Sequence, residues 1–230
     1  MAESGIAIEA HGLVKFYRHF PVLRGVDLSV RRGACFALFG ANGAGKTTLV
    51  RILCTLLRPT EGRFAIAGID GSEDREAVRE KLFLIAHGHH FYDDLTPLEN
   101  LKFHAGLRGI SLPADAVRGA LAWVGLERFA DFKIRQFSTG MKKRLAFTQA
   151  RLFGPEVLLL DEPYTALDEK GVRLVNGFIK EFTAGGGTVF MATHNRYFAL
   201  EVATDTMLLK NGVLQPIPPG RDPDRWHEIL

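Results

Sequence analysis

Eight consecutive residues have the types and spacing needed to hold a chain of phosphates. They match the pattern G-x-x-x-x-G-K-S/T, and the run is Gly40, Ala41, Asn42, Gly43, Ala44, Gly45, Lys46 and Thr47. Glycines in such a loop allow successive backbone N–H groups to turn inward around an anion, and the helix expected after the loop adds its N-terminal dipole. We therefore expect Lys46 to bind the β- and γ-phosphates of a nucleotide, Thr47 to bind Mg²⁺ and Thr48 to help bind the α-phosphate.

Two neighbouring carboxylates, Asp161 and Glu162, follow the apolar run 157–160. An apolar run of this length is typical of a buried strand. If that strand lies beside the strand that precedes the phosphate loop, Asp161 can support a magnesium ion. Glu162 is then the natural general base for a water molecule that attacks the γ-phosphate. Without the phosphate loop, the pair would be read as two solvated acids at the end of a strand.

A third motif is the run Phe137-Ser138-Thr139-Gly140-Met141-Lys142-Lys143-Arg144. Ser138, which lies 23 residues before Asp161, is a favourable helix N-cap, and Thr139 and Gly140 leave the first helical amides accessible. By itself the run is a capped helix. Its three consecutive basic residues suggest a solvated helix face rather than a nucleic-acid site.

In this order, the motifs resemble those of the ATP-binding subunits of ABC transporters, and the resemblance covers nearly the whole chain. The signature motif departs from the usual L-S-G-G-Q at Phe137, Thr139 and Met141 but keeps Ser138 and Gly140. The other matches are the Walker A loop at 40–48, the Walker B motif at 160–163, the D-loop that ends at Asp168, the switch histidine His194, and Tyr17 at the position where an aromatic ring stacks on adenine. A surface tyrosine is the competing interpretation of Tyr17.

The largest departure from the family pattern is at the Q-loop, where His87 takes the place of the usual glutamine. A neutral imidazole can donate or accept a hydrogen bond, so His87 is expected to approach the metal ion or the attacking water and to report the nucleotide to a membrane partner. Two alternatives are a metal or haem site built from His87, His89 and His90, and three loop histidines without a role. A histidine at this position resembles the ATP-binding subunit of the haem exporter of cytochrome c maturation; other ABC-2 exporters are the alternative.

The resemblance implies an α/β fold, namely a RecA-like P-loop NTPase core with an antiparallel β region and a helical subdomain. It implies one nucleotide-binding domain over 1–230, with the core and β region at about 1–86 and 155–215, the helical subdomain at about 90–150 and a loose tail at 216–230. It further implies ATP and Mg²⁺ as cofactors, a transmembrane permease as partner, and a location on the cytoplasmic face of the cell membrane. In the implied head-to-tail dimer, Ser138 and Gly140 of one subunit complete the nucleotide site of the other, and Asp168 belongs to the nucleotide-binding set.

The elements that must position these motifs are short strands alternating with helices. Apolar periodicity and capping signals predict strands at 6–10, 23–30, 34–39, 64–67, 82–86, 157–160 and 188–192, and helices at 47–57, 96–107, 113–123, 139–154, 169–184 and 197–203. Asn211-Gly212 predicts a hairpin turn between two further strands.

Composition excludes several other kinds of protein. With 47% hydrophobic and 24% charged residues, the chain of 230 residues can form a core and is not disordered. The net charge of +3 is too small to indicate nucleic-acid binding. Cys35 and Cys54 lack metal-ligand spacing and are expected to be buried, reduced thiols. No apolar run reaches the ~18 residues of a membrane span, and the first residues do not resemble a secretory signal.

Three further function classes are less consistent with the motifs. A GTPase would need a guanine-reading N-K-x-D motif, which the sequence lacks. A soluble ABC ATPase of translation or DNA repair usually has two cassettes or a long coiled-coil insertion, for which 230 residues leave no room. A regulatory module that only binds phosphate would not need both Asp161 and Glu162.

Overall fold

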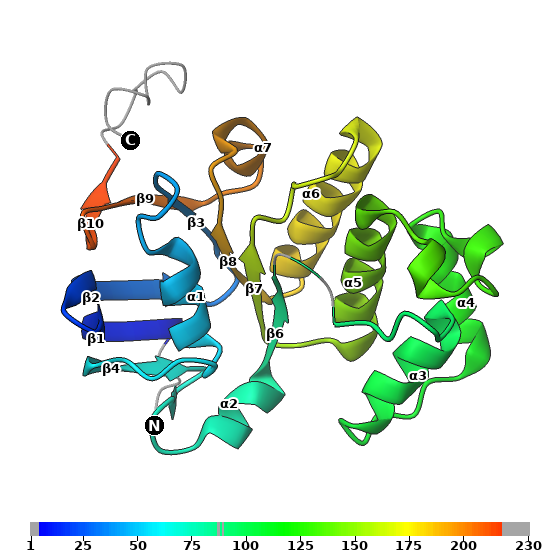
Figure 1. Cartoon of the computed structure of the whole chain (residues 1–230), viewed down its shortest axis with the longest axis horizontal. Coiled ribbons are helices and arrows are strands. Elements are labelled where there is room, and N and C mark those ends of the chain that lie inside the picture. The colour runs from blue at the N-terminus through cyan, green and yellow to red at the C-terminus, as the bar shows by residue number, and fades with distance from the viewer. Residues whose placement is uncertain (1–4, 87, 89, 218–230) are drawn as a thin grey trace.

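The computed structural model describes residues 5–86, 88 and 90–217, which form two β-sheets and the helices around them (Figure 1). The antiparallel sheet has the strand order β2-β1-β4-β5 and consists of β1 (Ile6–Tyr17), β2 (Phe20–Arg31), β4 (Glu61–Ile66) and β5 (Ile69–Asp70). The second sheet has the order β10-β9-β3-β8-β7-β6 and consists of β3 (Cys35–Phe39), β6 (Leu82–Ile85), β7 (Val157–Asp161), β8 (Thr188–Ala192), β9 (Asp205–Lys210) and β10 (Val213–Pro216).

The second sheet carries the predicted phosphate loop, which follows β3, and the predicted carboxylate pair, which lies at the end of β7. Strands β3, β7 and β8 confirm the strands predicted at 34–39, 157–160 and 188–192, and every one of their residues is buried, as in a sheet covered on both faces. Strands β6, β7, β8, β3 and β9 are parallel, so their carboxyl ends lie at the same edge. The expected direct pairing of β7 with β3 is wrong, because β8 lies between them.

Seven α-helices and two short 3₁₀ helices, Glu127–Phe129 and Ile134–Gln136, surround the sheets in the part of the chain that the structure describes. The α-helices are α1 (Lys46–Leu53), α2 (Arg75–Lys81), α3 (Pro97–Gly106), α4 (Ala114–Trp123), α5 (Thr139–Phe153), α6 (Glu169–Ala184) and α7 (Arg196–Leu200). Figure 1 shows α3 and α4 at the end of the molecule that lies away from the antiparallel sheet. Helix α3 begins with the predicted capping box, in which Thr96 and Glu99 satisfy each other's backbone N–H groups.

Most differences from the predicted elements occur at their ends. Helix α1 stops at Leu53 rather than at residue 57, because Thr55 adopts the left-handed conformation with a φ of 63°. Helix α2 and strand β5 were not predicted. The Asn211-Gly212 hairpin is confirmed, with both residues at positive φ as a type I′ turn requires. The sequence predicts Pro216 to be in the tail, but Pro216 is the last residue of β10 and pairs with Met207 of β9. Residues 218–230 lie outside the described residues.

None of the described helices combines the length and the apolar character that crossing a bilayer would need.

Candidate functional site

The phosphate loop joins β3 to α1, and close backbone packing explains two of its glycines. A Cβ atom on Gly40 would lie 2.6 Å from the carbonyl oxygen of Leu209. Gly45 has a φ of 106° and would bring a Cβ within 3.1 Å of Val22. Lys46 is 6% exposed, and its ammonium group donates to the carbonyl oxygens of Gly40 at 2.7 Å and Ala41 at 3.2 Å. Burial lowers the pKa of Lys46, although Glu162 and Asp161 oppose this effect.

Thr47 of α1 and Asp161 of β7 are in contact, although β8 lies between β7 and β3, the strand that precedes the phosphate loop. Helix α1 packs against both β7 and β8, and the Thr47 hydroxyl donates to Oδ1 of Asp161 at 3.2 Å. Asp161 is 4% exposed, and burial, together with the charge of Glu162, raises its pKa. The structure thus places a hydroxyl and a carboxylate oxygen side by side at the carboxyl edge of the sheet, and Mg²⁺ prefers oxygen ligands of this kind.

Glu162 directly follows β7 and is held by the loop that follows β8. Its carboxylate accepts hydrogen bonds from the Thr193 hydroxyl at 3.0 Å and from the backbone N–H of His194 at 3.1 Å. Nδ1 of His194 lies 2.9 Å from Oε2 of Glu162, and Nζ of Lys46 lies 3.9 Å from Oε1. The structure therefore brings together Lys46, Thr47, Asp161, Glu162 and His194, all of them predicted site residues.

A cavity of about 580 Å³ opens over the phosphate loop, and several of the predicted site residues line it. Its lining includes 41–43, 45–48, Asp161 and Glu162. It also includes His90, whose sequence context suggests only a metal ligand or a loop histidine. His87, together with His89, lies outside the described residues, so its predicted role is untested. Within 5–86, 88 and 90–217 no group of three His, Cys, Asp or Glu side chains could hold a metal ion.

Ser138, Gly140 and Asp168 stand apart from this cavity and have structural roles within their own chain. The Ser138 side chain caps α5 by accepting from the N–H of Met141 at 3.2 Å. The Asp168 side chain caps α6 by accepting from the N–H of Gly171 at 2.8 Å. A Cβ on Gly140 would lie 2.6 Å from the carbonyl oxygen of Ala166. One chain therefore does not bring its own signature motif to its phosphate loop.

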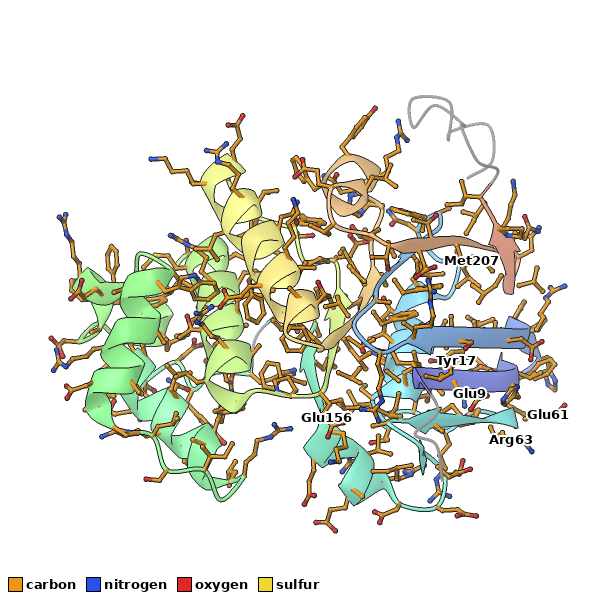
Figure 2. The ribbon with its side chains drawn as sticks, turned by 180° about the vertical axis from the view of Figure 1, so that it is seen from behind. Glu9, Tyr17, Glu61, Arg63, Glu156 and Met207 are labelled. Atoms are coloured by element: carbon orange, nitrogen blue, oxygen red, sulfur yellow. The ribbon has the colours of Figure 1, made fainter. Side chains whose placement is uncertain are left out.

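Tyr17 is at the end of β1, on the antiparallel sheet and far from α3 and α4 (Figure 2). Its side chain is 44% exposed, and Nζ of Lys15 lies 5.7 Å from the ring centroid. Among the described residues that line the 580 Å³ cavity, β2 contributes Val22 and β1 contributes none. The stacking of Tyr17 on adenine therefore remains a prediction.

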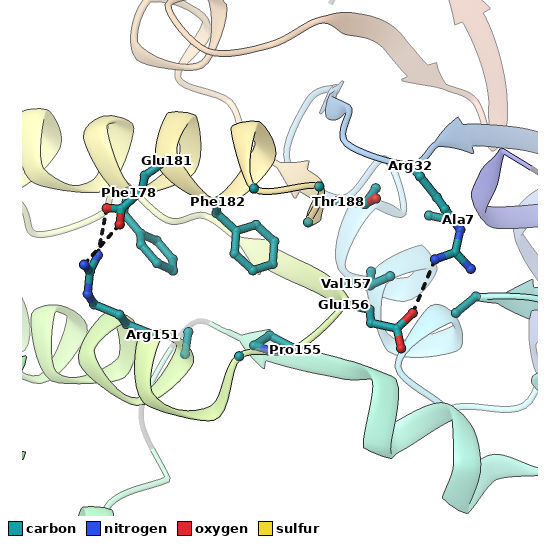
Figure 3. A pocket seen from close by; sticks show the side chains of 16 residues that line it. Ala7, Arg32, Arg151, Pro155, Glu156, Val157, Phe178, Glu181, Phe182 and Thr188 are labelled. Atoms are coloured by element: carbon teal, nitrogen blue, oxygen red, sulfur yellow. Dashed lines mark hydrogen bonds and ion pairs between the residues drawn. The ribbon is translucent and has the colours of Figure 1, made fainter. Parts of the chain in front are cut away.

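Another cavity, of about 510 Å³, lies at the amino ends of β7 and β8 (Figure 3). Its four charged side chains pair with one another: Arg151 makes two hydrogen bonds to Glu181, at 2.8 and 3.1 Å, and Arg32 lies 3.5 Å from Glu156. These charges are engaged in ion pairs, and none of the predicted site residues that the structure describes lines this cavity. The predicted phosphate-binding residues and carboxylates lie instead at the carboxyl end of the sheet, where the phosphate loop is.

The two cysteines are buried and unpaired, as predicted. Burial, together with the nearby charge of Asp205, raises the pKa of the Cys35 thiol to about 12. Such a thiol is unreactive at neutral pH.

Comparisons with known proteins agree with this geometry. The model of the ABC transporter family matches residues 23–165. The chain is 37% identical over 181 residues to the cytochrome c biogenesis ATP-binding export protein CcmA of Methylococcus capsulatus, a match that covers 79% of this chain and 86% of that protein. It is 38% identical over 203 residues to the daunorubicin resistance ATP-binding protein DrrA3 of Streptomyces coeruleorubidus, covering 84% of this chain and 61% of that protein. The structure of the dimeric ATP-binding cassette MJ0796, in a post-hydrolysis state bound to ADP and Pi, superposes with a TM-score of 0.84 at 26% identity and covers 94% of this chain and 99% of that one.

Proposed function

The chain belongs to the ABC transporter family, whose ATP-binding cassettes couple ATP hydrolysis to transport, and from this premise we propose that Glu162 is the general base of the hydrolysis. The observation that carries the proposal is the orientation of the Glu162 carboxylate by Thr193 and His194 beside Lys46. A carboxylate held in this way can accept a proton from a water molecule positioned to attack the γ-phosphate. His194, exposed on its outer side, contacts the γ-phosphate and keeps the carboxylate in place.

The other phosphate-loop residues bind and orient the nucleotide. Lys46 binds the β- and γ-phosphates, and the backbone N–H groups of the loop and of the first turn of α1 surround the phosphate chain. Thr47 and Asp161 would hold a magnesium ion, since their oxygens lie 3.2 Å apart at the carboxyl edge of the sheet. When bound, that ion supplies neutralisation of phosphate charge. Tyr17 stacks on the adenine ring.

We propose that the second half of each nucleotide site comes from another copy of the chain or from a similar subunit. Ser138 and Gly140 stand apart from the 580 Å³ cavity of their own chain, at the N-terminus of α5. A helix N-terminus offers free amides and a positive dipole to an anion. In a head-to-tail dimer this N-terminus would cover the γ-phosphate of the partner subunit, and the dimeric state of the MJ0796 cassette supports this arrangement.

Replacement of Glu162 tests the proposed base. Glu162→Gln keeps the size of the side chain but removes its ability to accept a proton, so ATP binding should be retained and turnover should fall by a factor on the order of 10² or more. ATP affinity is measured by titration with a fluorescent analogue, and turnover by phosphate release. Glu127→Gln, which changes an exposed residue, is the matched control. Turnover at the wild-type rate in Glu162→Gln would show that another group is the base.

We propose haem export for cytochrome c assembly as the transport that this ATPase drives, acting from the cytoplasmic face of the membrane on a separate permease. The support is the similarity to CcmA, whose name assigns it to cytochrome c biogenesis. Export of another cargo by an ABC-2 type permease is the second candidate, because DrrA3 is similar at 38% identity. Deletion of the gene should lower the covalently bound haem of c-type cytochromes, whereas a drug exporter would instead lose drug tolerance. Capture of ribosomes or DNA rather than a membrane protein would favour a soluble ABC ATPase.

A further inference from the structure

The basic run on α5 does not form the solvated face that its sequence suggested. Its middle residue, Lys143, is only 6% exposed. Lys142 and Arg144 are half-buried: Nζ of Lys142 lies 3.0 Å from the Asp93 carboxylate, and Arg144 donates to the carbonyl oxygen of Val124 at 3.0 Å. A lysine is almost never fully buried unless it is paired. The burial of Lys143 therefore requires a partner of its own.

The partners of Lys143 are two backbone carbonyls of the nucleotide site. Its ammonium group donates to the carbonyl oxygen of Ala86 at 3.3 Å and to that of Glu162 at 3.3 Å. Ala86 directly follows β6 and lines the 580 Å³ cavity, and Glu162 is the proposed general base. One side chain of α5 thus bridges the end of β6 and the end of β7.

The same face of α5 approaches the segment after Glu162 a second time. Gly140 and Lys143 are three residues apart and so lie on one face of the helix. A Cβ on Gly140 would be 2.6 Å from the carbonyl oxygen of Ala166. Glu162 and Ala166 both have left-handed backbone, with φ of 53° and 63°, a conformation that costs roughly 1–2 kcal/mol in a non-glycine residue. The segment 162–166 therefore depends on surrounding contacts for its conformation, and α5 supplies two of them.

The charge of Lys143 suits this role. Burial lowers the pKa of Lys143, but Asp161 and Glu162 oppose this effect by favouring the charged form. A hydrogen bond from a charged donor is roughly twice as strong as a neutral one. An ammonium group at this position therefore holds a carbonyl more firmly than a neutral amide could.

We propose that Lys143 is a positioning residue for hydrolysis: by holding the peptide of Glu162 and the end of β6 against α5, it keeps the Glu162 carboxylate aligned for proton abstraction. The inference rests on the proposed role of Glu162. In the proposed dimer, the N-terminus of α5 serves the nucleotide site of the partner subunit. Through Lys143, the same helix is hydrogen-bonded to Glu162, the proposed general base of its own site.

The test is the replacement of Lys143 by methionine, which keeps the length of the side chain but removes the donor. Because a misplacement of about 1 Å can cost on the order of 10² in rate, kcat for ATP should fall by about tenfold to hundredfold. KM for ATP should stay within about twofold, because the ammonium group of Lys143 donates to Ala86 and Glu162 and not to the phosphate loop at 40–48. Lys143→Arg, which keeps the charge and can donate to both carbonyls, should recover most of kcat. Lys180→Met, at an exposed position of α6, is the matched control and should keep wild-type values.

The outcomes separate this inference from the proposed function. If Lys143→Met and Lys143→Gln both keep wild-type kcat, or if Lys143→Arg recovers nothing, the positioning role is wrong. If Lys143→Met does not fold, Lys143→Gln, whose neutral amide keeps one donor group, is measured in its place, and a fall of kcat at unchanged KM supports the role. If Glu162→Gln itself turns over at the wild-type rate, the proposed function fails first, whatever Lys143 does.

Discussion

At the scale of single residues, the site contains a carboxylate whose burial weakens the fold. Burial, ahead of the charge of Glu162, raises the pKa of Asp161, which is 4% exposed. A carboxyl group with a raised pKa in the folded state binds its proton more tightly when folded than when unfolded. The resulting stability is present below the ordinary Asp pKa of about 3.9 and is lost as the pH rises through the folded value. At pH 7 the ionised Asp161 therefore lowers the free energy of unfolding.

Asp161→Asn should accordingly stabilise the chain at pH 7 while it abolishes turnover. The uncharged amide removes the cost of a buried charge and can still accept a hydrogen bond from Thr47, so Tm should rise by about 2–4 °C, on the order of 1 kcal/mol. Activity is lost because the carboxylate oxygen offered to Mg²⁺ is lost. Thermal unfolding at pH 7 and at pH 4 measures the effect, which should shrink at the lower pH. Asp131→Asn, at an exposed position, should change Tm little, and a lower Tm for Asp161→Asn would contradict the argument.

Local patterns predicted the residues whose chemistry lies within one motif, and they missed those whose role depends on distant segments. Lys46 and Thr47 begin α1 at the end of the phosphate loop, and Asp161 and Glu162 stand at the end of β7, so motif spacing alone indicates their place. Lys143 contacts Ala86, which is 57 residues away in the chain. Its burial depends on how α5 packs on the sheet, and no local pattern reports that packing.

At the scale of elements, Gly140 shows that the signature motif is also a packing motif within its own chain. A methyl group at this position would lie 2.6 Å from the Ala166 carbonyl oxygen. Gly140→Ala should therefore shift the first turn of α5 away from the segment 162–166 and destabilise the chain by about 1–3 kcal/mol. Turnover should fall more than tenfold, whereas ATP affinity should stay near the wild-type value, because the phosphate loop is untouched.

Gly119 provides the matched control for Gly140→Ala. It lies within α4, and a Cβ there would meet no atom within 4 Å. Gly119→Ala should be neutral or stabilise by up to about 1 kcal/mol, since alanine favours a helix interior. Urea unfolding and phosphate release measure both variants. Equal stability and turnover in the two variants would show that the close approach at Ala166 is readily relieved.

Among the elements, long periodic segments were predicted well and short polar ones were not. The prediction for α6 has the observed bounds, because its apolar residues repeat at helical spacing between the Asp168 cap and Gly185. Helix α2 has seven residues, of which only Val78 is buried. It is stabilised by the Asp74 cap and by its packing against β5 and β6. That packing is tertiary, so the local pattern could not reveal it.

At the scale of the whole molecule, the core is divided among three apolar clusters. One lies beneath the phosphate loop and includes Leu49 and Leu53 of α1 with residues of both sheets. A second joins α5 and α6 to the other face of the central sheet. The third is formed by buried residues between Phe91 and Leu145, which lie on α3, α4 and α5 and on the segments that precede and join them. Since the buried residues of the third cluster come from one continuous segment, we predict that it can loosen without disturbing the nucleotide-binding loop.

Leu121→Ala tests this prediction, because Leu121 is 1% exposed in the centre of the third cluster. A cavity left by this change should cost about 2–5 kcal/mol. If the cluster is a separate cooperative unit, hydrogen exchange should accelerate in α3 and α4 and change little in β3 and α1. ATP affinity should be retained, but turnover should fall, because α5 carries both Lys143 and the signature motif. Leu53→Ala, in the cluster beneath the phosphate loop, should instead accelerate exchange in α1 and weaken ATP binding. Uniformly faster exchange in both variants would mean that the three clusters unfold together as one cooperative unit, and the prediction of a separately loosening third cluster would then be wrong.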